Sequence, residues 1–338
     1  MEEQTQPIIT PHIYESYKDP DAHVHTIADA VDGAMTDLQE WQTANLPLGI
    51  PTGIEELDNT TNGWWPGELV VIAGKPSTGK TALALNMLKY AAVDAQVPSM
   101  FITLEASERE IARRLSILVS GLSNENIRGV KELEDYQWEQ LEYALKPLSK
   151  APIYIDCSTR LTTEDIGAKI QKYSREKGVR LIFIDDFQSI STPVDYAGNK
   201  EAEMTNISLE LKRIAREQEV TIITIARLSR GAGKAYERTS SQKPQLNDLK
   251  DTSSLEYDAD RIIFVHPKDY MGLSDYPEDH NKVTLILAKN RTGDTRDIEM
   301  KFNPEECRFY EPDTSLDLHA YPSAMSSSVN GDFDDNTF

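Results

Sequence analysis

Short apolar runs alternate with amphipathic segments over most of the chain. Apolar residues that repeat at spacings of three and four predict helices at 107–120, 136–148, 163–177 and 203–218. Compact apolar runs predict strands at 69–73, 99–104, 153–155, 181–184, 221–225, 262–265 and 283–288. This alternation is typical of α/β proteins, so we expect a mostly parallel sheet covered by helices on both faces. Residues 297–302 and 308–310 predict a closing antiparallel hairpin.

Both ends of the chain depart from this pattern. Residues 1–20 are polar, contain prolines and lack periodicity, which predicts a flexible arm. Apolar residues then recur on one face, so residues 21–47 are expected to form an amphipathic helix and its connection to the next domain. This apolar face needs a partner, which is either the chain's own globular domain or a neighbouring subunit. Residues 313–338 carry no Lys or Arg and predict a disordered acidic tail.

Composition narrows the class of protein. A chain of 338 residues can hold one large domain or two ordinary ones. With 2 Cys, no long apolar run and no signal-peptide pattern at the start, we expect a soluble cytoplasmic protein without a disulfide framework or a zinc cluster. The net charge of -21 argues against a surface coated by nucleic acid, but it leaves room for DNA in a local basic channel.

The sequence GKPSTGKT, at residues 74–81, matches the phosphate-binding pattern G-x-x-x-x-G-K-[ST]. It lies between a predicted strand and a helical segment, and this context favours a nucleotide site over an ordinary strand–helix turn. The glycines allow successive N–H groups to converge on phosphate oxygens at a helix N-terminus. The expected cofactor-binding residues are Gly74, Pro76, Ser77, Thr78, Gly79, Lys80 and Thr81, with Lys80 on the β- and γ-phosphates and Thr81 on Mg²⁺.

Two carboxylates are expected beside this loop. Asp185 ends the apolar run 181–184, as a Walker B residue that holds Mg²⁺ does. Asp186 follows it directly and can also serve, although the first acid is the usual Mg²⁺ partner. Glu105 ends another strand at the same edge, where a carboxylate can polarise the attacking water. Alternatively, Glu105 has no catalytic role and is only an acidic residue at the start of the helix at 107–120.

Lys289 and Arg291 follow the predicted strand 283–288. Two cations at a strand end can simply be solvated. They can also enter the nucleotide site of an adjacent subunit, where an arginine finger stabilises charge in the transition state.

Together these motifs resemble the RecA-type motor domain of the DnaB-family replicative helicases, including the helicase domains of phage helicase–primases. The resemblance covers roughly residues 48 to 312, and it also includes 49–58, 184–188 and 247–260. The segment 247–260 is its most specific part, because generic P-loop ATPases lack it. The resemblance implies a RecA-like P-loop NTPase fold with a mostly parallel central sheet, and a linker helix that packs on the neighbouring subunit.

The same resemblance implies a function. A homo-hexameric ring would hydrolyse ATP, or another nucleoside triphosphate, with Mg²⁺ at its subunit interfaces and move 5′ to 3′ along single-stranded DNA in a phage replisome. The implied catalytic residues are Lys80, Glu105, Arg227, Lys289 and Arg291, and the Mg²⁺ ligands are Thr81 and Asp185. Phe302 would stack on the nucleotide base. The implied DNA contacts are Lys250, Asp251, Thr252 and Ser253, with Arg230 from a basic loop that precedes them.

The chain departs from the family pattern at two positions of the site. The strand-end residue that senses the γ-phosphate is usually Gln, or His in the phage helicase–primases, and here it is Arg227. The residue after the Walker B acid is usually aromatic or His, and here it is Asp186. A permanent cation at 227 puts in question how hydrolysis is coupled to the grip on DNA. We also expect that nearly all of the family's N-terminal domain, with the region that recruits primase, is missing.

Two alternatives to a helicase remain at this stage. One is a RecA-like recombination mediator or strand-annealing ATPase without processive unwinding, which the departure at Arg227 leaves open. The other is an ATP-binding scaffold that recruits a polymerase through its tail. The tail resembles those of phage helicase–primases and single-stranded-DNA-binding proteins, which present a terminal aromatic residue, here Phe338, to basic partners. Its partner would be a DNA polymerase, a primase or a single-strand-binding protein, or it would only increase solubility.

Overall fold

The computed structural model describes residues 24, 26–43, 49–129, 131–228, 243–269 and 279–312. The expected N-terminal arm, the acidic tail and most of the basic loop, including Arg230, lie outside these residues. Within the part of the chain that is described, no helix is long and apolar enough to cross a membrane.

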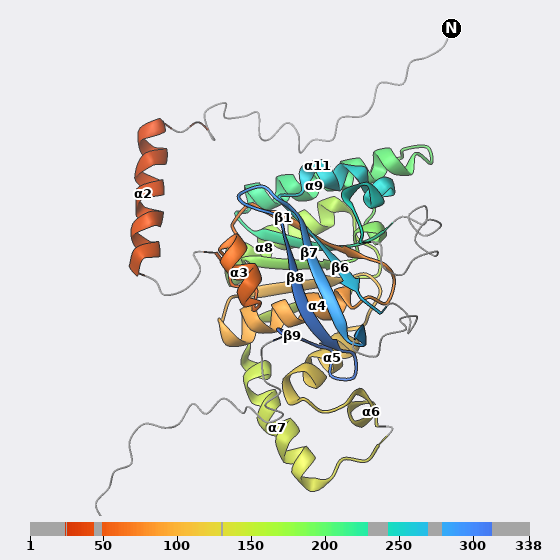
Figure 1. Ribbon diagram of the computed structural model, residues 1–338. Coiled ribbons are helices and arrows are strands. Elements are labelled where there is room, and N and C mark those ends of the chain that lie inside the picture. Colours follow the sequence, from red (N-terminus) through yellow and green to blue (C-terminus); the bar gives the residue numbers. More distant parts are fainter. Residues whose placement is uncertain are drawn as a thin grey trace, which may run out of the picture.

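The described strands form one nine-stranded sheet at the centre of the domain (Figure 1). Their order across the sheet is β3-β2-β4-β5-β1-β6-β7-β8-β9. All neighbours from β3 to β6 are parallel, and β7, β8 and β9 complete the sheet in antiparallel pairs. The mostly parallel sheet and its closing hairpin are therefore confirmed. The strands are β1 Leu69–Gly74, β2 Ser99–Thr103, β3 Ile153–Asp156, β4 Leu181–Asp185, β5 Thr221–Arg227, β6 Arg261–Pro267, β7 Lys282–Asn290, β8 Arg296–Asn303 and β9 Arg308–Tyr310.

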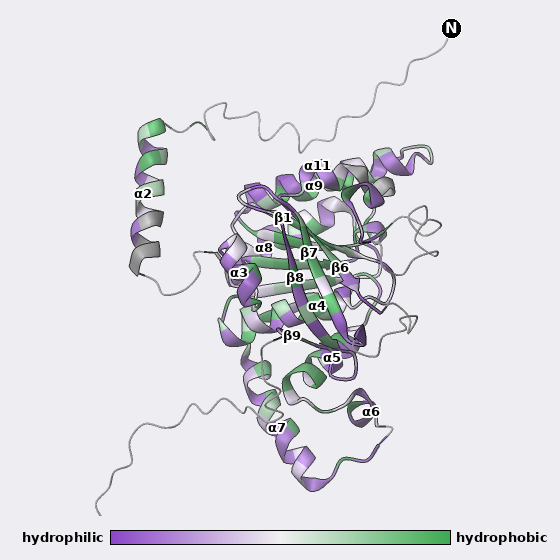
Figure 2. Cartoon of the chain, in the orientation of Figure 1, coloured by the Kyte–Doolittle hydropathy of each residue, from purple (hydrophilic) through white to green (hydrophobic). Residues whose placement is uncertain are grey.

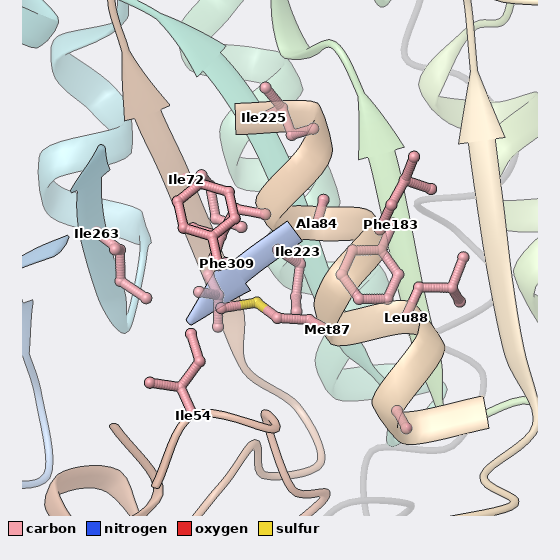
Figure 3. Close-up of a cluster of buried hydrophobic side chains, with 14 of the residues drawn as sticks. Ile54, Ile72, Ala84, Met87, Leu88, Phe183, Ile223, Ile225, Ile263 and Phe309 are labelled. Atoms are coloured by element: carbon pink, nitrogen blue, oxygen red, sulfur yellow. The ribbon is translucent and has the colours of Figure 1, made fainter. Parts of the chain in front are cut away.

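Helices cover both faces of the sheet, as the alternating pattern predicts. One apolar cluster joins the strands to α4 and α5, and Figure 3 shows Ala84, Met87 and Leu88 of α4 packed toward the strands. A second cluster joins the opposite face to α8, α9 and α11. The described helices are α2 Ile27–Thr43, α3 Glu55–Thr61, α4 Lys80–Lys89, η1 Tyr90–Asp94, α5 Glu108–Ser120, α6 Asn124–Ile127, α7 Asp135–Lys150, α8 Thr163–Lys177, η2 Phe187–Ser189, α9 Lys200–Glu217, η3 Leu246–Thr252 and α11 Ser253–Asp258.

Local caps explain where the helices begin and end. The Thr162 side chain accepts a hydrogen bond from the Asp165 N–H, and the Asp165 carboxylate accepts one from the Thr162 N–H. At the other end, Gly178 ends α8 in a left-handed conformation. The predicted bounds of α8 are therefore confirmed. Helix α9 begins three residues earlier than the pattern predicts, because Asn199 caps it by accepting from the Ala202 N–H. The short helices α3 and α11 were not predicted, since neither is long enough to show a helical period.

Helix α2 confirms the predicted amphipathic helix, although it begins at Ile27 rather than near residue 21. Its apolar side chains at Ile27, Val31 and Met35 are at least half exposed. Figure 2 shows α2 standing away from the sheet, with apolar residues along part of its length. Those apolar side chains of α2 that the structure describes are therefore unpartnered in the single chain.

A buried ion pair fixes the segment that leads into β1. The guanidinium of Arg261, on β6, is fully buried and pairs with Glu68 Oε1 at 3.0 Å. Its Nη1 also donates to the Gly63 carbonyl at 2.6 Å, and its Nη2 donates to the Thr61 carbonyl at 3.2 Å. Burial raises the pKa of Glu68 and lowers the pKa of Arg261, because both charges have left water. Each of these two buried charges is therefore stabilised by the other.

Glu68→Gln should destabilise the fold strongly, because it leaves the buried Arg261 cation without its counter-charge. We expect a loss of about 3–5 kcal/mol in the free energy of unfolding, measured by urea denaturation. The matched control is Glu217→Gln, which removes a carboxylate from the exposed Arg213 on α9 and should cost less than about 1 kcal/mol. Equal losses in the two variants would contradict the account of this pair.

Candidate active site

The loop between β1 and α4 has the backbone shape that its sequence predicts. Gly79 has a φ of 90° and caps α4, and Ser77 also lies in the left-handed region. A Cβ at Gly74 would come within 2.8 Å of Thr78 Oγ1 and 3.0 Å of the Val265 carbonyl, so only glycine fits there. The loop leads directly into the N-terminus of α4, where unpaired N–H groups and the helix dipole favour an anion.

Lys80 lies buried beside this loop. Its side chain folds back so that Nζ donates to the Lys75 carbonyl at 2.6 Å, and only 9% of the residue is exposed. Burial lowers the pKa of Lys80 from its usual 10.5 to about 8, with Asp185 opposing the shift and Arg227 adding to it. A desolvated ammonium at this position is a strong partner for a phosphate group, because the phosphate would give the buried cation a direct counter-charge.

Thr81 and Asp185 meet at the first turn of α4. Thr81 Oγ1 donates to Asp185 Oδ2 at 2.8 Å. Burial raises the pKa of Asp185, and the charges of Asp186 and Glu105 act in the same direction against the Thr81 hydrogen bond. This combination of a hydroxyl, a carboxylate and excess negative charge fits Mg²⁺, which takes one or two protein oxygens and completes its shell with phosphate and water. Among the described residues no cluster of three or more acidic, His or Cys side chains forms a separate metal cage.

Glu105 lies at the same edge of the sheet, where it meets Arg227. The strands β2, β4 and β5 are parallel neighbours, so the residues at their carboxyl ends come together. Arg227 Nη2 bonds to Glu105 Oε1, and Arg227 Nε pairs with Asp186 Oδ2 at 2.5 Å. The side chain of Glu105 is 62% exposed and that of Asp186 only 3%. The structure thus brings Lys80, Thr81, Asp185, Glu105 and Arg227 into one site.

Phe302 lies against the glycine loop. Its ring stacks on Phe309 with centroids 4.5 Å apart, and its edge is 3.3 Å from where a Cβ of Gly79 would lie. The β8–β9 hairpin therefore places an aromatic pair next to the phosphate loop. This position is compatible with the predicted contact between Phe302 and a nucleotide base.

Lys289 and Arg291 lie at the opposite edge of the sheet. Arg291 Nη1 pairs with Asp260 Oδ1 at 3.1 Å, while Asp260 Oδ2 accepts from the N–H of Leu69, the first residue of β1. Lys289 Nζ donates to the Glu256 carbonyl at 2.7 Å. Since β1 has 6 residues and rises about 3.3 Å per residue, these cations lie roughly 15–20 Å from their own glycine loop. They cannot reach the phosphates bound by the same chain.

The predicted DNA-contacting residues 250–253 span the end of η3 and the start of α11. Leu249 and Leu255 on either side are fully buried and fix this segment to the core. The side chains of Lys250, Asp251, Thr252 and Ser253 are outside the description, as is the whole of Arg230, so their DNA contacts stay predictions.

Two residues near the site were missed from the sequence. Arg114, on α5, lies close enough for its charge to lower the pKa of Asp185 against the effect of burial. Gln188 exchanges two hydrogen bonds with the backbone of Arg227, at 3.0 and 3.1 Å. Arg114 lies on the helix that directly follows β2 and Glu105, and this place in the sequence indicates a position near the site. Gln188 falls within the segment 184–188 of the family resemblance, but its spacing does not indicate a contact with Arg227.

Comparison with known proteins places these features in one family. The profile of the DnaB-like helicase C terminal domain matches residues 49–311. The chain is 33% identical over 274 residues to the replicative DNA helicase DnaB of Geobacillus stearothermophilus, covering 81% of this chain and 59% of that relative. It is 32% identical over 274 residues to the replicative DNA helicase DnaC of Bacillus subtilis (strain 168), with the same coverage. The chain thus spans about three fifths of the length of these relatives.

Solved structures give the same result. The chain is similar to a structure solved as an ATPase domain, with a TM-score of 0.76 and 29% identity, covering 85% of this chain and 98% of that one. It is also similar to a DnaB-like replicative helicase solved in a study of its interactions with primase, with a TM-score of 0.74 and 27% identity, covering 89% of this chain and 70% of that one.

Lys80→Met should separate binding from stability. Removing a desolvated cation should raise the Tm of the nucleotide-free protein, because sites built for binding are held at a cost in stability. Nucleotide with Mg²⁺ at about 100 times its Kd should raise the Tm of the wild type by roughly 5 °C, and this increase should vanish in the variant. Differential scanning fluorimetry measures both effects.

The control is Lys200→Met, which replaces an exposed lysine on α9 and should change neither Tm nor the response to nucleotide. A Lys80→Met protein that still responds to nucleotide would contradict the role given to Lys80.

Proposed function

This chain belongs to the DnaB-like helicase C-terminal domain family, and we propose that it is the motor of an ATP-driven DNA helicase that works as a homo-hexameric ring. Members of the family hydrolyse ATP, and the nucleotide site has the residues for it. The ring, its 5′ to 3′ direction on single-stranded DNA and its place in a phage replisome are parts of the proposal.

One structural observation supports the proposed ring. The nucleotide-binding half of the site lies at the carboxyl edge of the sheet, and the Lys289–Arg291 pair lies at the opposite edge of the same chain. A head-to-tail contact between two copies puts the cations of one chain beside the phosphates of the next. Contacts of this heterologous kind close into rings when the rotation between copies permits it.

The exposed face of α2 supports the same assembly. Ile27, Val31 and Met35 are apolar and at least half exposed in the single chain. A helix with such a face is stabilised by burying it against a partner. We propose that α2 packs on the neighbouring protomer of the ring and so links the subunits.

The residues of the site have separate tasks in hydrolysis. Lys80 and the loop N–H groups would hold the β- and γ-phosphates, and Thr81 with Asp185 would hold Mg²⁺, which when bound would neutralise phosphate charge. Glu105 orients and polarises the attacking water. Arg291 and Lys289 from the next protomer stabilise the charge that develops on the transferred phosphoryl group. Because Arg291 and Lys289 come from another chain, the rate of hydrolysis depends on the contact between subunits. This dependence couples hydrolysis to movement along DNA.

DNA is proposed to pass through the ring along residues 250–253 and the basic loop that includes Arg230. Binding of this kind follows the phosphate backbone and does not read sequence. The family likeness also supports a contact with primase, since a similar helicase was solved in a study of that interaction. We propose the acidic tail as a contact for a DNA polymerase or a single-strand-binding protein, and the host cytoplasm as the setting.

The main test is unwinding of a forked DNA duplex with a 5′ single-stranded tail, in the presence of ATP and Mg²⁺. The wild type should unwind it, and Lys80→Ala should reduce the rate at least ~100-fold, because the phosphates lose their buried cation. A fork with only a 3′ tail is the matched control for direction. Strand annealing without unwinding would contradict the helicase and favour the recombination mediator, the alternative that the unusual Arg227 leaves open.

A mixing experiment tests the shared site separately. Lys80→Ala and Arg291→Ala proteins should each be inactive in ATP hydrolysis. Mixed in equal amounts, they should form rings in which about a quarter of the interfaces combine an intact loop with an intact arginine. The mixture should therefore recover measurable ATP hydrolysis. The control is a protein that carries both substitutions on one chain, which should stay inactive because none of its interfaces has an intact loop or an intact arginine. No recovery in the mixture would contradict an arginine that acts between subunits.

A further inference from the structure

The segment from Asp186 to Ser189 forms a support around Arg227. The Gln188 side chain donates to the Arg227 carbonyl at 3.0 Å and accepts from the Arg227 N–H at 3.1 Å. Asp186 Oδ2 pairs with Arg227 Nε at 2.5 Å. Asp186 Oδ1 is held in turn by the Ser189 N–H at 3.1 Å and the Ser189 hydroxyl at 2.5 Å. Both the backbone and the side chain of Arg227 are therefore fixed by one short stretch that follows β4.

The charges of Asp186 and Arg227 require each other. Asp186 is only 2% exposed and directly follows Asp185, so its carboxylate lies buried beside a second one. An unpaired buried carboxylate is strongly unfavourable. Burial opposes the charge of Arg227, but Asp186 and Glu105 raise its pKa above the usual value, so it stays cationic. The two departures from the family pattern, at 186 and 227, thus compensate each other as one ion pair.

Arg227 also lies near the place of the phosphates. On the sheet it is the register partner of Gly74, the first residue of the glycine loop, which lies on the neighbouring strand β1. Its charge also lowers the pKa of Lys80 beyond the effect of burial. Its Nη2 is bonded to Glu105, whose side chain is 62% exposed. A γ-phosphate held by Lys80 would come within range of the same guanidinium. Phosphate and Glu105 are then two anions that compete for the Nη groups, while Nε stays on Asp186.

We infer that Asp186 is a positioning residue that anchors Arg227, and that Arg227 exchanges Glu105 for the γ-phosphate when nucleotide binds. Without nucleotide, Glu105 is paired and cannot act on water. With nucleotide, Arg227 contacts the phosphate and Glu105 is released to orient the attacking water. The inference rests on the proposed hydrolysis at this site, and it gives the permanent cation at 227 a task that a neutral side chain cannot perform.

Competition for Arg227 is measured by nucleotide binding rather than by turnover. The probe is a non-hydrolysable ATP analogue with Mg²⁺, and its Kd is measured by titration calorimetry for the wild type, Glu105→Gln, Arg227→Gln and the double variant. Glu105→Gln removes the competing anion, so it should tighten binding about fivefold when Arg227 is present, the order expected of a half-exposed ion pair. In the Arg227→Gln background the same substitution should change Kd less than about twofold.

The comparison of the two backgrounds separates competition from repulsion. Glu105→Gln also removes a negative charge near the phosphates, and that effect is the same with or without Arg227. Equal tightening in both backgrounds would overturn the exchange. A wild type that binds the analogue but never hydrolyses ATP would contradict the proposed function while leaving the exchange supported by the binding cycle.

The anchoring role of Asp186 has its own test. Arg227→Gln should lower Tm because it leaves Asp186 unpaired, and Arg227→Gln with Asp186→Asn should recover it. Asp186→Asn alone should reduce the preference for the ATP analogue over ADP severalfold, as Arg227→Gln does, with no further loss in the double variant. A purely structural role would change Tm and leave this preference intact, and that result would overturn the assignment.

The matched control is Arg213→Gln on α9. Arg213 is also held by two carboxylates, Glu210 and Glu217, but its side chain is half exposed and neither carboxylate belongs to the site. It should change neither Tm nor the preference between the two nucleotides. A drop in Tm equal to that of Arg227→Gln would overturn the claim that the Asp186–Arg227 pair is special to the site.

Discussion

The structure depends on charges that are buried at one edge of a parallel sheet. Lys80, Asp185 and Asp186 are all largely removed from water close to the glycine loop. Charges in such a place interact more strongly than in solvent, and each is unfavourable without a partner. Parallel topology creates this crowding, because it aligns the carboxyl ends of β1, β4 and β5. We propose that a phosphate group and a divalent cation complete this arrangement of charges.

The opposite edge of the sheet is organised by a second buried acid. Asp260 holds the start of β1 through the Leu69 N–H, pairs with Lys212 at 2.5 Å and holds Arg291 by both backbone and side chain. The Arg291 side chain is nevertheless 60% exposed, so the fold presents this cation outward. In the proposed ring, the two halves of each active site would come from different chains, because one chain holds them on surfaces that cannot meet. Assembly, rather than movement within one chain, would then join them.

Much of this could be predicted from the sequence, where the signal was local. The glycine loop, the Walker B strand and the bounds of α8 follow from spacing and capping within a few residues. The pairing of Arg227 with Asp186 and Glu105 could not be predicted, because the three residues lie at the ends of three different strands, β5, β4 and β2, that are far apart in the sequence. The apolar pattern predicts the start of α9 three residues late, because the first turn of this helix is polar and its cap, Asn199, lies outside the pattern. Short helices such as α3 lack a period that could reveal them.

The central claim is that one active site is built from two protomers. Electron cryomicroscopy of the protein with Mg²⁺, a non-hydrolysable ATP analogue and single-stranded DNA tests it most directly. We predict a closed ring in which the Arg291 guanidinium of one protomer lies about 3 Å from a γ-phosphate oxygen bound by Lys80 of the next. Nucleotide bound to the loop with no side chain of a second protomer near its phosphates would contradict it.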